Sequence, residues 1–96
     1  MNAPNKSYSA RHSLKPTHFF CQAPGAKCVQ IAGDFNQWTP IGMARRFDGW
    51  WHCEILLCHG HHQYRFLVDG KASLDPAAMG TSRDSNGMPV SLIAVS

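Results

Sequence analysis

The chain has 96 residues, which is enough for one hydrophobic core and too few for two. Hydrophobic residues make up 44 % and charged residues 16 % of the sequence, a balance typical of a folded globular protein and not of a disordered chain. The net charge of +3 comes from basic residues that are scattered instead of clustered, which argues against nucleic-acid binding.

The sequence carries no sign of a membrane or secretory segment. No apolar stretch approaches the roughly 20 residues that a membrane-spanning helix needs, and residues 1–15 lack the apolar centre of a signal peptide. We therefore expect no membrane association and a cytoplasmic location, where thiols are kept reduced. The cysteines are accordingly expected to be free thiols, buried or half-buried, and their spacing is not that of a zinc knuckle: Cys21, Cys28, Cys53 and Cys58.

Composition divides the chain into an arm and a domain. Residues 1–16 are rich in Asn, Ser, Lys and Pro without apolar periodicity, which predicts a disordered N-terminal arm. Residues 17–96 carry short runs of alternating apolar residues separated by turn residues, a pattern typical of an all-β sandwich or barrel. The predicted strands cover residues 18–22, 27–32, 51–57, 62–68, 71–74 and 90–95, with a polar loop over 77–89.

The alternation within each run predicts which side chains face the core. Trp51 belongs to the core in this pattern, whereas Trp50 points the other way, either as a partly covered aromatic at the strand edge or as a stacking surface. Asp69-Gly70 is a strong hairpin signal between two of the runs. The side chains expected to point inward are Phe19, Cys21, Val29, Ile31, Trp51, Cys53, Ile55, Leu57, Tyr64, Phe66, Val68, Ile93 and Val95.

Four segments in register resemble a known family of carbohydrate-binding domains. They are Val29-x-Ile31-x-Gly33-Asp34-Phe35-Asn36-x-Trp38, then Gly49-x-Trp51, then Gly60-x-His62-x-Tyr64-Arg65-Phe66-x-Val68-Asp69-Gly70, and then Asp75-Pro76. Together they resemble carbohydrate-binding module family 48, which includes the glycogen-binding domain of the AMP-activated protein kinase β subunit and the N-terminal domains of isoamylases and branching enzymes. The resemblance spans residues 17 to 95, nearly all of the predicted domain.

This resemblance implies a fold and a ligand. The fold is an early-set immunoglobulin-like β-sandwich of two packed antiparallel sheets, and many members bind glycogen, starch or malto-oligosaccharides. In the family the tryptophan at the position of Trp38 stacks on a glucose ring. A basic residue after the tyrosine of the Tyr-x-Phe strand hydrogen-bonds sugar hydroxyls, and Arg65 stands there in place of the more usual lysine.

Two other positions depart from the family pattern. A second stacking tryptophan often follows the Val-Asp-Gly turn, but this chain has Lys71 and Ala72 there. An asparagine commonly ends the loop before the last strand, where this chain has Pro89 or Val90, so that Asn86 is the nearest candidate. Covering one indole face removes on the order of 80 Å² of apolar surface, or roughly 2 kcal/mol. Its loss predicts binding weaker by about 30-fold, nearer millimolar than micromolar.

Stacking on a sugar needs a flat apolar face beside groups that replace the hydration of the hydroxyls. A solvent-facing Trp38 near Arg65 would meet this need. The alternative is that Trp38 folds onto the edge of the sandwich, but its polar neighbours offer little apolar cover, and we expect it to be exposed: Asn36, Gln37, Thr39 and Pro40.

The sequence offers little support for a metal site or for catalysis. His59, His61 and His62 flank a glycine in a turn, which directs their side chains apart, so no metal site is expected. Most of the carboxylates stand in turns, where such side chains cap the backbone, instead of forming the spaced pair that glycoside hydrolysis requires: Asp34, Asp48, Asp69, Asp75 and Glu54. We expect no catalytic residue and no cofactor.

Two functions follow from these observations. The first is a non-catalytic module that binds an α-glucan weakly through Trp38, Arg65 and Asn86, either free-standing or helping a separate glycogen-metabolising enzyme to reach its substrate. The second is a protein-interaction or regulatory module of the same fold that has lost sugar binding and docks a partner through Trp38, Trp50 and a sheet face. Trp38 with Arg65 favours the first, and the absence of a tryptophan at Ala72 favours the second.

Overall fold

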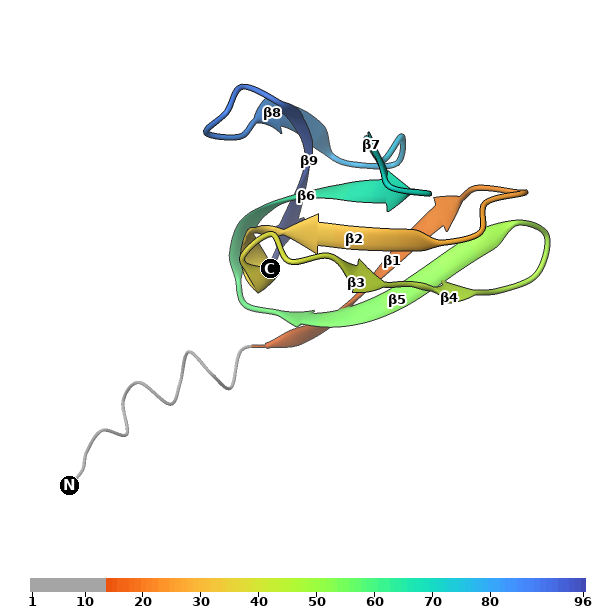
Figure 1. The fold of residues 1–96 in the computed structure, drawn as a ribbon. Helices are drawn as coiled ribbons and strands as arrows, with labels where there is room; N and C mark the ends of the chain where they lie inside the picture. Colours follow the sequence, from red (N-terminus) through yellow and green to blue (C-terminus); the bar gives the residue numbers. More distant parts are fainter. Residues whose placement is uncertain (1–13) are drawn as a thin grey trace.

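The computed structural model describes residues 14–96, which form short strands and one 3₁₀ helix, η1 (Figure 1). In chain order the elements are β1 (Lys15–Gln22), β2 (Val29–Gly33), η1 (Asp34–Asn36), β3 (Ile41–Gly42), β4 (Ala44–Arg45), β5 (Trp50–Leu57), β6 (Gly60–Val68), β7 (Lys71–Ser73), β8 (Gly80–Arg83) and β9 (Pro89–Val95). No helix within residues 14–96 has the length or the apolar character to span a membrane.

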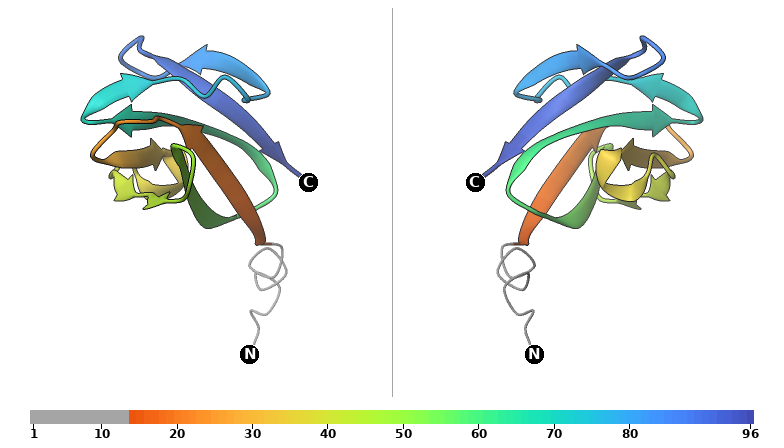
Figure 2. Two further views of the ribbon diagram at one scale, coloured as in Figure 1. Left: turned by 90° about the vertical axis from the view of Figure 1, so that its right-hand side faces the viewer. Right: turned by 90° about the vertical axis from the view of Figure 1, so that its left-hand side faces the viewer.

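The strands form two antiparallel sheets that pack face to face as an immunoglobulin-like β-sandwich, as expected. The smaller sheet has the order β1-β5-β4, and the larger has the order β3-β2-β6-β9-β8. Strand β7 pairs with the end of β6 that β9 does not reach. Figure 2 shows the two layers from the side, with β1 and β5 in one and β8 and β9 in the other.

The core lies between the sheets and is built mainly from side chains that the alternation predicts, together with Ala26 and Met43, which it did not predict. Phe19 from the smaller sheet meets Tyr64 from the larger one edge to face, with ring centroids 4.9 Å apart. Cys53, Ile55, Val68 and Ile93 are partly buried and pack against this centre. The predicted inward residues that are fully buried are Phe19, Cys21, Val29, Ile31, Trp51, Leu57, Tyr64, Phe66 and Val95.

The boundaries differ from the sequence prediction at both ends of the domain. Strand β1 begins at Lys15, two residues before the predicted start of the domain, and the rest of the predicted arm, residues 1–13, lies outside the described residues. The predicted loop over 77–89 was wrong in part, because it contains β8. This strand is an edge strand with mostly exposed side chains, so it pairs with β9 through its backbone and shows no apolar alternation. The two-residue strands β3 and β4 were also not predicted.

The cysteines are free thiols, but only two are covered as expected. Cys21 is buried and Cys53 half-buried, and burial raises the pKa of Cys21 and brings that of Cys53 to about 11. Cys28 and Cys58 are exposed, contrary to expectation. Cys28 points outward just before β2, and Cys58 lies in the turn between β5 and β6, so neither meets the core.

Candidate functional site

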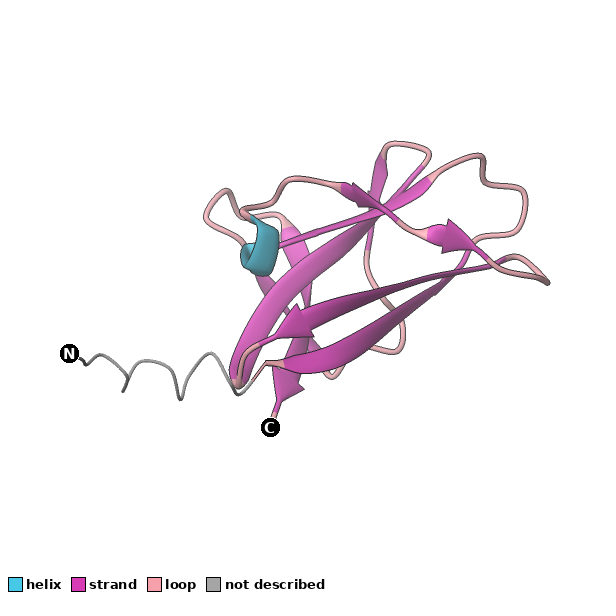
Figure 3. Cartoon of the chain, turned by 90° about the horizontal axis from the view of Figure 1, so that it is seen from below, coloured by secondary structure: helices cyan, strands magenta, loops and turns pink. Residues whose placement is uncertain are grey.

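The segment from Gly33 to Asn36 fixes the loop that carries Trp38. A Cβ at Gly33 would lie 2.5 Å from the ring of Phe35, so only glycine allows this ring to pack where it does, beside the core. The side-chain oxygen of Asn36 accepts a hydrogen bond from the backbone N–H of Gly33 at 2.9 Å, and Asp34 accepts one from the backbone N–H of Gln63 on β6 at 3.0 Å. These contacts attach η1, drawn in cyan in Figure 3, to the larger sheet.

The two residues after η1 adopt a backbone conformation that is unusual for side chains other than glycine. Gln37 and Trp38 have φ angles of 57° and 59°, in the left-handed region. Such a conformation costs about 1–2 kcal/mol per residue and is found where the surroundings hold it, often at functional sites. Here the backbone N–H of Trp38 donates to the carbonyl of Gly33 at 2.8 Å, which closes the loop.

Arg65 approaches the indole of Trp38 from β6. It lies between the buried residues Tyr64 and Phe66 and therefore points away from the core, onto the outer face of the larger sheet. Its guanidinium carbon lies 4.8 Å from the centre of the Trp38 ring, a cation–π contact. The guanidinium also forms an ion pair with Asp84, which comes from the turn between β8 and β9.

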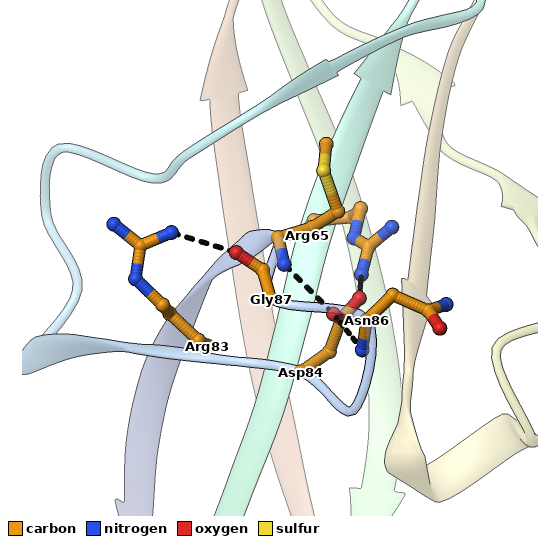
Figure 4. A network of polar contacts seen from close by, with 6 residues as sticks. Arg65, Arg83, Asp84, Asn86 and Gly87 are labelled. Carbon is orange, nitrogen blue, oxygen red and sulfur yellow. Dashed lines mark hydrogen bonds and ion pairs between the residues drawn. The ribbon is translucent and has the colours of Figure 1, made fainter.

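The turn over residues 84–87 places Asn86 beside this pair (Figure 4). One carboxylate oxygen of Asp84 accepts hydrogen bonds from the backbone N–H groups of Asn86 and Met88, both at 2.9 Å. The backbone N–H of Gly87 donates to the carbonyl of Asp84, and Gly87 has a φ of +81°, which favours glycine at this position of the turn.

The three predicted residues meet at one hollow of about 450 Å³ on the outer face of the larger sheet. The hollow offers an indole, an aliphatic side chain, a guanidinium and amide groups, which together can stack on an apolar ring face and hydrogen-bond hydroxyls. Its lining residues are Ala32, Trp38, Pro40, Gln63, Arg65, Leu67, Asp84, Ser85 and Asn86.

Trp38 is less exposed than the sequence suggests. Its indole is half-buried, because Arg65 lies over one face of the ring and the loop turns it toward β6. Asn86 is exposed at the rim. Ala72 pairs in register with Leu67, which lines the hollow, so the position of the family's second tryptophan is next to the site and carries only a methyl group.

A larger groove of about 1040 Å³ lies elsewhere, at the mouth of the sandwich between β1 and β7. Trp50, which is 39 % exposed, lines this groove together with Phe20. Because Trp38, Arg65 and Asn86 do not line it, Trp50 belongs to a different surface from the predicted site.

One of the three turn histidines, His62, has structural contacts. His62 makes a hydrogen bond to the carbonyl of Cys58 at 2.9 Å and lies 3.4 Å from Asp34, whereas His59 and His61 are exposed. Within residues 14–96, no three metal-ligating side chains come together.

Two of the motif aspartates likewise have structural contacts. Asp69 accepts hydrogen bonds from the backbone N–H groups of Lys27 and Cys28. Asp75 accepts one from the buried Tyr64 hydroxyl at 2.6 Å, and burial together with this bond raises the pKa of Tyr64. The aspartates of the family pattern therefore attach η1, a turn and a loop to neighbouring parts of the domain.

Asp84 is the main residue of the site that the sequence analysis missed. The only signal for it is local, since Asp-x-Asn-Gly over residues 84–87 is a typical turn sequence that predicts a hairpin. Nothing in the spacing connects this turn to Arg65. Gln63 and Leu67 could have been predicted, because they alternate with the inward residues of β6 and so share a face with Arg65.

Two antiparallel sheets packed face to face carry an indole and hydrogen-bonding groups around an outer hollow. Together with the family match that follows, this fold and site define a non-catalytic carbohydrate-binding module of immunoglobulin-like fold. The chain belongs to the family described as the glycogen recognition site of AMP-activated protein kinase, whose model matches residues 15–96. This match confirms the resemblance that the four sequence segments indicated.

Individual relatives agree with the family. The chain is 41 % identical to 5'-AMP-activated protein kinase subunit beta-1 of Sus scrofa over 69 residues, which are 71 % of this chain and 54 % of that sequence. It is 39 % identical to the Homo sapiens subunit over 54 residues, which are 55 % of this chain and 19 % of that one. The chain therefore spans about half, or less, of the length of these relatives.

A solved structure supports the fold. The crystal structure of a putative alpha amylase from Salmonella typhimurium superposes with a TM-score of 0.68 and 22 % sequence identity. The match covers 83 % of this chain and 13 % of the amylase chain. At this identity the likeness concerns the sandwich architecture alone.

Proposed function

We propose that the domain binds α-glucans such as glycogen, starch and malto-oligosaccharides in the hollow formed by Trp38, Arg65 and Asn86. The observation that carries this proposal is that three residues from separate elements, a loop, a strand and a turn, line one hollow in a member of a glycogen-recognition family. The strained backbone at Trp38 supports it as well, because such strain is kept most often where a side chain has a binding role.

The contacts suggest how a glucan would lie. Arg65 covers one face of the Trp38 ring, so a glucose ring would stack on the remaining accessible surface of the indole. The guanidinium has five N–H donors, and the ion pair with Asp84 uses one of its terminal nitrogens, which leaves donors for sugar hydroxyls. The amide of Asn86 would bind hydroxyls from the opposite rim.

We expect weak binding, since the site has a single stacking aromatic. Covering one indole face with a sugar contributes roughly 2 kcal/mol to binding. The family's second tryptophan is replaced by Ala72, which pairs with Leu67 and offers only a methyl group, so almost all of this energy is lost. The corresponding loss of about 30-fold in affinity predicts dissociation constants nearer millimolar than micromolar. Such affinities suit a polymer, because many equivalent sites on one glycogen particle offset the weakness of each.

A role in a larger assembly is part of the same proposal. The domain would bring a catalytic domain or a separate glycogen-metabolising enzyme to its substrate, in the cytoplasm where glycogen is stored. The domain itself would contribute binding only, and catalysis would lie in another domain or chain.

A second candidate is supported by a different surface. Phe20 and Trp50 are 51 % and 39 % exposed and line the groove between β1 and β7, and exposed apolar side chains of this kind are common at protein interfaces. On this alternative the fold serves as a protein-interaction module that does not need the sugar site.

Co-sedimentation with glycogen separates the two candidates. The glucan proposal expects the unmodified domain to pellet with glycogen and Trp38→Ala to remain in the supernatant. Trp50→Ala is the control, because it removes a solvent-accessible indole from another surface, and it should pellet normally. Co-sedimentation with cellulose, a β-linked glucan, serves as the control for non-specific adsorption to an insoluble polysaccharide. Failure of the unmodified domain to pellet at high glycogen concentration would overturn the proposal in favour of the interaction module.

A further inference from the structure

We propose that Asp84 is the positioning residue of the hollow and holds Arg65 and Asn86 where they can bind glucan hydroxyls at the same time. The inference rests on the proposed glucan-binding function and adds to it a residue outside the four segments that carry the family resemblance. It also makes the turn between β8 and β9 part of the binding site.

The two carboxylate oxygens of Asp84 accept hydrogen bonds from different parts of the domain. Oδ1 accepts the backbone N–H groups of Asn86 and Met88, which fixes the turn and with it the backbone position of Asn86 at the rim of the hollow. Oδ2 accepts a hydrogen bond from Nη2 of Arg65. A single side chain thus joins the turn to β6 across the hollow (Figure 4).

Arg65 depends on this link. Its side chain is long and flexible, and a cation–π contact at a partly exposed site contributes only about 0.5–1 kcal/mol, which is too little to hold it in one place. Its Nε atom is buried without a hydrogen-bond partner among the described residues, and a partly buried guanidinium without a counter-charge is unfavourable. The charged hydrogen bond to Asp84 supplies both the counter-charge and a fixed direction.

The ion pair is well sheltered from solvent. The side chains of Arg65 and Asp84 are 20 % and 12 % exposed, so water screens their attraction less than in a surface pair. The backbone N–H of Met88 lowers the pKa of Asp84 most, burial opposes this, and Arg65 and the N–H of Asn86 lower it further. Asp84 is therefore ionised at neutral pH.

Substitutions can distinguish a positioning role from a simple role in the turn. Asp84→Asn keeps an oxygen that can accept the two backbone N–H groups but removes the charge that holds Arg65. Asp84→Ala removes both. Asp69→Asn is the matched control, since Asp69 also accepts two backbone N–H groups but lies away from the hollow. Thermal unfolding of each variant establishes that it is folded.

The affinities for maltoheptaose are measured by chemical-shift titration of the isotope-labelled protein. Asp84→Asn should weaken binding about 5- to 10-fold, the effect of losing one charged hydrogen bond at the site, and Asp84→Ala should weaken it more. Asp69→Asn should bind like the unmodified protein. In an Arg65→Gln background, Asp84→Asn should have almost no further effect, because the residue through which the charge acts is already gone.

Each other outcome counts against a specific statement. If the unmodified protein binds maltoheptaose and folded Asp84→Asn binds equally well, the positioning role is wrong while the proposed function stands. If Asp84→Asn weakens binding as much in the Arg65→Gln background as without it, Asp84 acts only through the turn, and the inference fails. If the unmodified protein does not bind, the glucan-binding function fails, and the inference fails with it.

Discussion

Two tryptophan–arginine pairs on this domain have almost the same geometry and different surroundings. The guanidinium carbon of Arg45 lies 4.9 Å from the ring centre of Trp51, and that of Arg65 lies 4.8 Å from the ring centre of Trp38. Trp51 and Arg45 belong to the paired strands β5 and β4, whereas Trp38 lies in the loop after η1 and Arg65 in β6. The contact alone therefore does not tell a structural pair from a binding pair.

The first pair closes the edge of the core. Trp51 is 6 % exposed, and its indole N–H donates to the backbone carbonyl of Ala23 at 3.2 Å. Arg45 donates to the backbone carbonyl of Ala26 at 2.8 Å. The polar groups of this pair are thus bonded to the backbone of the loop after β1. Neither Trp51 nor Arg45 lines the hollow at Trp38 or the larger groove between β1 and β7.

The second pair opens onto a hollow. Trp38 is half-buried in a left-handed loop, and Arg65 is bonded to a carboxylate from a distant turn instead of to a carbonyl. Trp38 and Arg65 both line this hollow. On this domain, the arginine bonded to a backbone carbonyl therefore fastens the fold, whereas the arginine paired with a side-chain carboxylate stands at a hollow large enough for a ligand.

The largest expected effect concerns the core tryptophan. Trp51→Ala should lower the free energy of unfolding by about 3–5 kcal/mol, because it removes a large buried side chain and leaves a cavity. Trp38→Ala should lower it by about 1 kcal/mol or less, since that ring is half-buried and its loop is strained. Urea unfolding followed by circular dichroism measures both. Equal losses for the two variants would contradict the division between a structural and a binding pair.

The next largest effect is expected from adding a second aromatic side chain near Trp38 and Arg65. Ala72→Trp should tighten maltoheptaose binding by about 30-fold, or roughly 2 kcal/mol, because position 72 pairs with Leu67, which lines the hollow, and a long side chain there would extend toward it. Ser73→Trp is the control, since Ser73 pairs with the inward-facing Phe66 and so lies on the other face of β7. An unchanged affinity in Ala72→Trp would mean that the hollow does not extend to this strand.

Most of the sandwich could be predicted from sequence because its central strands bury one face. The alternation that puts Phe19, Tyr64 and Leu57 inside is a direct consequence of that burial. Strand β8 could not be predicted in this way, because it is held by backbone pairing with β9 while its side chains remain in water. Hydrogen bonds of the backbone leave no pattern in the side chains.

The sequence predicted residues that line the site, but it did not predict how they are arranged. Trp38, Arg65 and Asn86 could be named from the family resemblance, and the structure places all three at one hollow. The half-burial of Trp38 depends on the position of Arg65, which depends in turn on Asp84. Such a chain of contacts between a loop, a strand and a turn is set by tertiary structure, and no local spacing records it.

Replacing each arginine by alanine should distinguish the two pairs by glucan affinity, with effects smaller than those of Trp51→Ala on stability and of Ala72→Trp on affinity. Arg45→Ala should lower the free energy of unfolding by about 1–2 kcal/mol through the loss of a cation–π contact and a hydrogen bond, with glucan affinity unchanged. Arg65→Ala should weaken glucan binding about 10-fold and should also lower the free energy of unfolding by about 1–2 kcal/mol, because it removes a cation–π contact and the ion pair with Asp84. Glucan affinity is therefore the property that separates the two variants. Unfolding curves and maltoheptaose titrations of both variants form the test. Loss of affinity in Arg45→Ala without unfolding would remove the distinction between the pairs.

The smallest expected effect is a change of stability in acid that belongs to the binding pair alone. The N–H of Met88, and then Arg65 and the N–H of Asn86, hold the pKa of Asp84 below its ordinary value despite burial. Its value in the unfolded chain is about 3.9, so the stabilisation from the charged carboxylate is complete above that pH and is lost as the pH falls through the lower folded-state pKa.

Urea unfolding between about pH 3 and pH 6 can detect this loss as a difference between the unmodified protein and Asp84→Asn. The difference should be constant above about pH 5 and shrink in more acid solution, because protonation makes the two side chains alike in charge. Arg45 bonds to a carbonyl that does not titrate, so Arg45→Ala should differ from the unmodified protein by the same amount throughout this range. A pH-independent difference for Asp84→Asn would mean that its charge contributes nothing to the turn, and that Arg65 is held by the indole alone.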